Sequence, residues 1–277
     1  MQKLKWTALA VLLLGACAQQ APETTGENTA EETQTVENGD KAEGMVSSPA
    51  DPYPSTYERY PGEPGLITGA TVLTGTGERI DNGAVYLEDG KIAAVGAAGA
   101  LTVPEGTTTI DAGGKWVTPG VIDIHSHLGD YASPYTQSLS DGNEVVSPNT
   151  AYVWAEHSIW PQDAGFTRAL AGGVTSLQIL PGSANLFGGR SAILKNVPSR
   201  TVQGMKFPNA PYGLKMACGE NPKRVYGDRG GPQTRMGNMA GYRSAWIEAA
   251  GYKKKWDDYE KKYAEWEEDD SEDKDEN

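Results

Sequence analysis

The sequence has 277 residues, of which 38% are hydrophobic and 22% charged, and its formal net charge is -13 at pH 7. A chain of this length and composition can bury a sizeable core. The excess acid lies at the two ends, because residues 18–65 carry a net charge of -8 and residues 267–277 carry -7, whereas residues 66–266 hold 19 basic and 19 acidic residues. This distribution excludes a basic surface for nucleic acid or for an anionic membrane.

The first 17 residues have the layout of a secretory signal. Two lysines precede an apolar run over residues 7–14, which is too short to span a bilayer. The run ends in Leu14-Gly15-Ala16-Cys17, which resembles a bacterial lipobox and implies lipidation of Cys17. Because Ala18 follows the cysteine, the resemblance favours a lipid anchor in the outer membrane, at the periplasmic face. A plain signal peptide with a chance cysteine is the alternative.

Residues 18–65 are predicted to form a disordered acidic linker, because they nearly lack the large aliphatic side chains that would offset the entropy of ordering. Over residues 66–117 the sequence changes to short β-like runs, two of them joined by Asp89-Gly90, a strong hairpin signal. The runs lie at residues 66–73, 83–88, 91–95, 107–110 and 115–117. We expect a small β-sandwich module here.

A turn at Pro119-Gly120 leads into the apolar run Val121–Ile124, which has the features of a strand buried on both faces. His125 and His127 follow two residues apart, so they point to the same side of the strand. Two imidazoles at this spacing can converge on one ion, with bonds of about 2.0–2.1 Å. They provide half of a metal site.

The pattern of residues 119–127, Pro-Gly, apolar, Asp, apolar and His-x-His, resembles the first barrel strand of the amidohydrolase superfamily. The resemblance implies an α/β fold class, with a partial (β/α)8 barrel of the TIM type over residues 118–266. It also implies a metal-dependent hydrolase that uses one or two divalent ions, with zinc expected. Residues 173–189, which include Gly-Val-Thr and Leu-Pro-Gly-Ser-Ala-Asn, are similar to an imidazolonepropionase-like subgroup.

Two further elements follow in this region. Asp163 is placed to cap a helix that runs through Leu170 and stops at Gly172-Gly173, and Val174–Leu180 is predicted to be a second strand. This order indicates parallel strands joined by crossovers.

The loop after the second strand is rich in small residues, which let a substrate approach the backbone closely. The similarity to the imidazolonepropionase-like subgroup favours a substrate loop that includes Ser183 and Asn185. An ordinary Gly-rich turn is the alternative.

Pro211–Gly219 is predicted to be a third strand, and it offers two candidates for a further metal ligand. Glu220 follows the carboxyl end of the strand, where barrel enzymes place their chemistry, and is preferred. Lys215 is the second candidate, because some amidohydrolases bridge two metals with a carbamylated lysine. A loop-capping glutamate and a lysine whose stem packs in the barrel are the structural alternatives.

From about residue 233 the sequence is helical. Trp256, Tyr259, Tyr263 and Trp266 have helical spacing and form one aromatic stripe, which is either a packing face or an interface with material that this chain lacks. Residues 267–277 are predicted to be an acidic disordered tail.

The family takes two more histidines and a general-base aspartate from later strands, and no histidine follows His157 here. The resemblance therefore implies the N-terminal fragment of an enzyme that hydrolyses an amide or cyclic amide C-N bond with metal-activated water. This fragment is expected to be inactive alone, with its catalytic aspartate beyond the chain. The expected partners are a small amide-type substrate, a membrane through Cys17, and a C-terminal half that completes the barrel. A non-catalytic surface lipoprotein that keeps the scaffold for binding, and one half of a split enzyme, are the alternatives.

Overall fold

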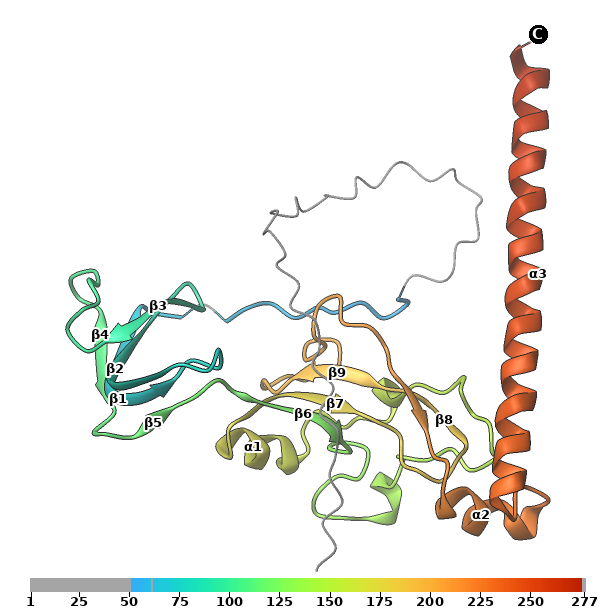
Figure 1. The fold of residues 1–277 in the computed structure, drawn as a ribbon, viewed down its shortest axis with the longest axis horizontal. Coiled ribbons are helices and arrows are strands. Elements are labelled where there is room, and N and C mark those ends of the chain that lie inside the picture. The colour runs from blue at the N-terminus through green and yellow to red at the C-terminus, as the bar shows by residue number, and fades with distance from the viewer. Residues whose placement is uncertain (1–50, 61, 276–277) are drawn as a thin grey trace, which may run out of the picture. The chain divides into compact units, whose positions relative to one another are not determined.

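The computed structural model describes residues 51–60 and 62–275 (Figure 1). The described residues all belong to one compact unit, which covers residues 51–277. The predicted signal sequence, Cys17 and most of the predicted linker lie outside the described residues. Among the helices that are described, none is both long and apolar enough to cross a membrane.

The first module is a five-stranded sheet, whose strands confirm the predicted β-like runs. Its order is β3-β2-β1-β4, with β5 also paired to β1. The strands are β1 (Gly65–Leu73), β2 (Arg79–Glu88), β3 (Lys91–Ala97), β4 (Thr108–Asp111) and β5 (Trp116–Val117). Asp89 and Gly90 both have positive φ angles, 50° and 67°, as a tight two-residue hairpin requires. The described part of this module is one sheet rather than the two packed sheets of the predicted sandwich.

A second sheet carries the predicted parallel strands. β6 (Val121–Ser126) pairs in parallel with β7 (Val174–Ile179), and β7 pairs antiparallel with β9 (Ala192–Lys195). Helix α1 (Ala164–Ala171) connects β6 and β7 as predicted, and the Asp163 side chain caps it by accepting a hydrogen bond from the Gly165 amide. The core beneath this sheet includes Phe166, Leu177, Ile179, Leu194 and Met205.

The chain then forms a short antiparallel pair and two helices. β8 (Phe187–Arg190) pairs with β10 (Leu214–Met216), and α2 (Glu220–Tyr226) and α3 (Arg235–Asp275) follow. Short 3-10 turns lie at Gln137–Leu139, Ala155–His157 and Gly227–Arg229. The predicted third strand over 211–219 is thus three residues long, and it is antiparallel to its neighbour. It cannot use the whole predicted range, because Pro211 has no amide to donate and Gly219 caps α2.

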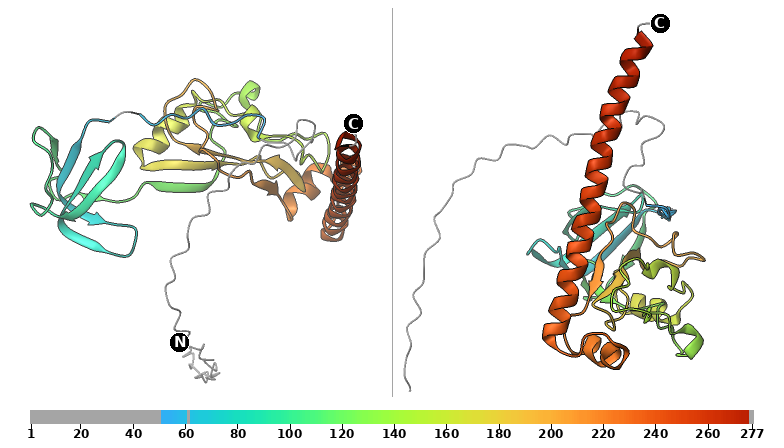
Figure 2. Two further views of the ribbon diagram at one scale, coloured as in Figure 1. Left: turned by 90° about the horizontal axis from the view of Figure 1, so that it is seen from above. Right: turned by 90° about the vertical axis from the view of Figure 1, so that its right-hand side faces the viewer.

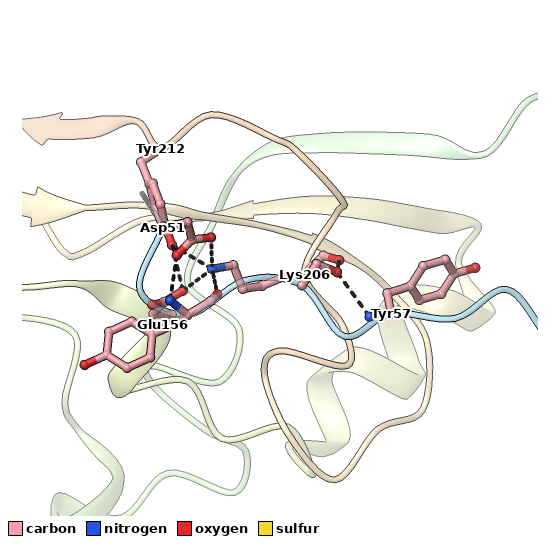
Figure 3. A network of polar contacts seen from close by, with 7 residues as sticks. Asp51, Tyr57, Glu156, Lys206 and Tyr212 are labelled. Carbon is pink, nitrogen blue, oxygen red and sulfur yellow. Dashed lines mark hydrogen bonds and ion pairs between the residues drawn. The ribbon is translucent and has the colours of Figure 1, made fainter. Parts of the chain in front are cut away.

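Two predicted disordered ends differ from the structure. Residues 51–60 pack against the segment before β10, where Lys206 forms ion pairs of 2.8 Å with both Asp51 and Glu156 (Figure 3). The prediction of disorder considered only the burial of apolar side chains, so it did not account for these ion pairs. At the other end α3 continues to Asp275, into the predicted tail, because glutamate is a good helix former.

The fold is a mixed α/β fold, and the described residues do not form a closed barrel. β6 is an edge strand of its sheet, with Val121, Ile122 and Ile124 exposed by 51%, 67% and 72%. The prediction that this strand is buried on both faces is therefore wrong for the described chain. Its apolar side chains would need further neighbours to be covered.

Candidate active site

The two histidines lie together at the carboxyl end of β6. His125 belongs to the strand and His127 follows it by one residue, and their ring centroids are 5.3 Å apart. The strand spacing thus brings two imidazoles to one place, as predicted.

A backbone contact fixes the orientation of His127. Its Nδ1 lies 2.7 Å from the carbonyl oxygen of Leu180, the residue that follows β7. Because a carbonyl only accepts hydrogen bonds, Nδ1 carries the proton and the lone pair belongs to Nε2. Burial also lowers the pKa of His127, which favours the neutral form that binds metals.

Lys215, rather than Glu220, joins the histidines. The Nζ atom of Lys215 lies 3.1 Å from His125 Nε2, and burial lowers the pKa of this lysine. Glu220 begins α2, where its side chain is 74% exposed and pairs with Lys223 at 2.6 Å. The structure thus does not bring the preferred candidate, Glu220, to the histidines, because the strand ends at Met216 and the glutamate is already helical.

Because Gly188 on β8 has no side chain, it leaves space for the side chain of Lys215. A Cβ atom at position 188 would stand 3.3 Å from Cγ of Lys215, closer than side chains normally pack. The sequence analysis gave two interpretations of the Gly-rich segment, a substrate loop and an ordinary turn. In the structure the segment includes strand β8, which pairs with the strand that carries Lys215.

A cavity of about 360 Å³ opens beside His127. Ser183 lines it, as predicted for the substrate loop, and its hydroxyl accepts a 2.6 Å hydrogen bond from the Asn221 amide. The other lining residues are Tyr131, Asn143, Val145, Gly182, Ala184, Arg224 and Val225.

Asn185 does not reach the cavity. It is 1% exposed, and its amide nitrogen lies 2.6 Å from the carbonyl of Glu144, 2.9 Å from that of Ser147 and 2.8 Å from the Tyr226 hydroxyl. Its contacts hold together the loop after β6 and helix α2. We assign Asn185 a structural role in the loop rather than a contact with substrate.

Four polar residues of the cavity were missed in the sequence. Tyr131 and Asn143 come from the long loop after β6, where the Asn143 amide donates to the Tyr131 hydroxyl. Asn221 and Arg224 come from α2. The available signal was their position after strand ends, where α/β enzymes gather active-site loops, but it does not distinguish these residues from their neighbours.

The donor set fits part of a metal site. Within residues 51–60 and 62–275, no group of three His, Cys, Asp or Glu side chains is arranged to hold an ion. His125 and His127 offer two imidazole nitrogens, and the amine of Lys215 is a third nitrogen beside them. Catalytic zinc normally has three protein ligands, so these residues fit two of the three positions, and the third requires a chemically altered lysine or another residue.

No protein-family model matches the sequence. The amidohydrolase tasK of Hapsidospora irregularis is 34% identical over 239 residues, which cover 76% of this chain and 24% of the relative. An imidazolonepropionase of Bacillus thuringiensis (strain Al Hakam) is 34% identical over 117 residues, covering 37% of this chain and 28% of the relative. The crystal structure of an amidohydrolase from Thermotoga maritima MSB8 is 41% identical, with a TM-score of 0.63, covering 69% of this chain and 49% of that one. These homologues are amidohydrolase-family proteins.

The homologues support placing the chain in the amidohydrolase superfamily, and they suggest a hydrolase that acts on C-N bonds. The chain spans about a quarter of the length of these curated relatives and about half of the Thermotoga amidohydrolase. Members of the superfamily generally use divalent metals, which agrees with the paired imidazoles.

Proposed function

We propose that this chain is the N-terminal part of a metal-dependent amidohydrolase that hydrolyses an amide or cyclic amide C-N bond. The observation that carries the proposal is that His125, His127 and Lys215, which come from two separate sheets, lie together beside a cavity. Similarity to amidohydrolases and to an imidazolonepropionase supports it.

In this proposal His125 and His127 hold a divalent ion, with zinc expected and one or two ions allowed. Such an ion lowers the pKa of a water molecule and polarises the carbonyl that the water attacks. The carbonyl of Leu180 keeps His127 in the tautomer that presents Nε2. Lys215 would provide the third donor as a carbamate, which forms when its neutral amine adds to carbon dioxide and releases a proton.

The cavity beside His127 would bind the amide substrate. Ser183, Asn143 and Arg224 offer a hydroxyl, an amide and a guanidinium at its wall. Arg224 is the only charged residue that lines this cavity in the described chain, so a carboxylate or polarised carbonyl of the substrate is expected there.

Further strands would complete the site. The exposed apolar side chains of β6 favour a C-terminal half that pairs with this edge, whether on the same polypeptide or on a separate one. That half would supply the general-base aspartate, and this chain alone would be inactive. A non-catalytic binding protein built on the same scaffold is the competing proposal.

The test is metal analysis and amide hydrolysis, measured on this chain with and without a supplied C-terminal half. His125→Ala and His127→Ala should each abolish bound zinc and activity, whereas His157→Ala, the remaining histidine, should change neither. Lys215→Ala should lose activity that a short-chain carboxylic acid partly restores, because its carboxylate can take the place of the carbamate. If the reconstituted wild-type protein retains no divalent metal, the hydrolase proposal fails and the binding scaffold is favoured.

We also propose that Cys17 is lipidated and that the protein is anchored at the periplasmic face of a bacterial outer membrane. The lipobox-like residues 14–17 support this. Metabolic labelling with a fatty-acid analogue should mark the wild type and a Cys218→Ser control, but not Cys17→Ser. Equal labelling of the Cys17→Ser variant would contradict the anchor.

A further inference from the structure

The second half of α3 carries a continuous aromatic face, and Figure 2 shows this helix as unbroken in both views. Its members are Tyr252, Trp256, Tyr259, Tyr263 and Trp266. Their spacings alternate between four and three residues, which is the repeat of a coiled-coil seam. Successive rings contact one another, with centroid distances from 5.5 to 6.3 Å. We call this set the aromatic seam.

The aromatic seam has no partner element in the described chain. Helix α3 is attached at its beginning, where the Tyr242 hydroxyl donates to the Ala217 carbonyl and the Phe187 ring contacts Tyr242 and Trp246. Beyond that point Tyr252, Tyr259 and Trp266 are 63%, 44% and 56% exposed. A run of large rings exposed along one face of a helix marks an interaction surface.

We propose that the aromatic seam pairs with the same seam of a second copy of this chain, in a parallel two-stranded coiled coil. The charges beside the seam favour a second copy of this chain as the partner. With Trp256 and Tyr263 at the a positions, the g positions are Glu248, Lys255 and Lys262, and the e positions are Lys253, Glu260 and Glu267.

In a parallel dimer each g residue faces the e residue five positions further along the other copy. The three facing pairs are Glu248 with Lys253, Lys255 with Glu260, and Lys262 with Glu267, and all three are of opposite charge. An antiparallel pair with its aromatic layers in register would instead set Lys255 against a lysine of the other copy. Charge complementarity therefore fixes both the partner and its direction.

The length of the seam sets the expected strength. From Tyr252 to Trp266 the helix spans roughly 21 Å at 1.5 Å per residue, about two heptads. Such a short seam gives a reversible dimer, which we expect to dissociate in the micromolar range. Pairing does not involve the proposed active site, so its test is independent of hydrolase activity.

A charge-exchange experiment tests the pairing on the full chain. The variants Lys255→Glu/Lys262→Glu and Glu260→Lys/Glu267→Lys each place like charges opposite one another in a homodimer. Sedimentation equilibrium should show the wild type doubling in mass with concentration, each variant remaining monomeric, and an equal mixture of the two forming a heterodimer. The control Lys254→Glu/Lys261→Glu changes two lysines that face away from the seam and should dimerise like the wild type.

A cross-linking experiment tests the direction. Tyr252→Cys and Trp266→Cys, each with Cys17 and Cys218 replaced by serine, should both form disulfide-linked homodimers on mild oxidation, because equivalent seam residues meet in a parallel pair. Circular dichroism confirms that each variant is helical. A monomeric wild type at 100 micromolar, a mixture that does not associate, or cross-linking at neither position would overturn the proposal.

Discussion

An ion-paired cluster around Lys206 contains two buried charged side chains, those of Lys206 and Glu156. Glu156 has a side-chain exposure of 0% and lies 2.8 Å from Lys206, which is 7% exposed (Figure 3). Burial alone lowers the pKa of Lys206, but its hydrogen bonds to Asp51 and Glu156 raise it overall. The lysine therefore stays charged and compensates two carboxylates.

Lys206→Met should lower the free energy of unfolding by about 3–5 kcal/mol, because it leaves the Glu156 carboxylate buried without a counter-charge. The double variant Lys206→Met/Glu156→Leu should recover much of this loss, since it removes the two buried charges and leaves only Asp51, which is partly exposed. Chemical denaturation of the three proteins measures the difference. A single variant as stable as the wild type would show that Glu156 is not held by the lysine.

Asp51 gives the same cluster a pH dependence. Burial raises its pKa, but hydrogen bonds from Lys206 and Tyr212 outweigh this and leave the pKa below the ordinary value of 3.8. A lowered folded pKa stabilises the fold above the ordinary value, and the contribution is lost as the pH falls through the folded pKa. Asp51→Asn should therefore be less stable than the wild type at pH 7, with the gap closing below about pH 4. A gap that stays constant with pH would contradict this origin.

Some residues of the candidate site could be predicted from the sequence, and others could not. The pairing of His125 with His127 follows from strand alternation over three residues, so it could be predicted. The choice between Lys215 and Glu220 depends on where β10 ends and on which strand it pairs with. The residues around these positions predict neither the end of the strand nor its partner. Cavity residues such as Asn221 depend on the same long-range placement.

At the scale of elements, Asp163 ties α1 to the loop that follows His127. It is 2% exposed and accepts hydrogen bonds from three backbone amides, those of Gly165 at 2.8 Å, Gly129 at 2.9 Å and Ser133 at 2.9 Å. The cap therefore serves the helix and also fixes the start of the active-site loop.

Asp163→Ala should lower the free energy of unfolding by about 3–5 kcal/mol, since it removes a helix cap and leaves further amides without partners. Asp163→Asn keeps one carbonyl oxygen and should lose less. Thermal or chemical unfolding ranks the variants, and hydrogen exchange should show faster exchange at Gly129 and Ser133 in the alanine variant. Equal stability of all three proteins would exclude this role.

Elements with strong local signals were predicted correctly, whereas β8 and the end of α3 were missed. The hairpin at Asp89-Gly90 and the capped helix α1 are encoded within a few residues. β8 was missed because two of its four residues are glycines, which weaken a strand pattern. The continuation of α3 to Asp275 was not predicted, because residues 267–277 were expected to be disordered on the basis of their negative charge alone.

At the scale of the whole molecule, β6 is central to the proposed site but lies at the edge of its sheet. Ile124 is 72% exposed one residue before His125, while Ile92 on β3 is 66% exposed in the separate β-module. These two isoleucines have similar exposure but different expected roles. Only the first would be covered by strands that complete a barrel.

Ile124→Glu should change the free energy of unfolding of this chain by less than about 0.5 kcal/mol, because the side chain already contacts water. In the presence of the C-terminal half, the same change should abolish association and hydrolysis, since a charge would then be buried without a partner. Ile92→Glu should leave stability, association and hydrolysis unchanged. Unfolding of the chain alone measures the effect on stability, and binding to the added C-terminal half measures the effect on association. Equal effects of Ile124→Glu and Ile92→Glu on binding would show that β6 is not the edge on which the rest of the enzyme assembles.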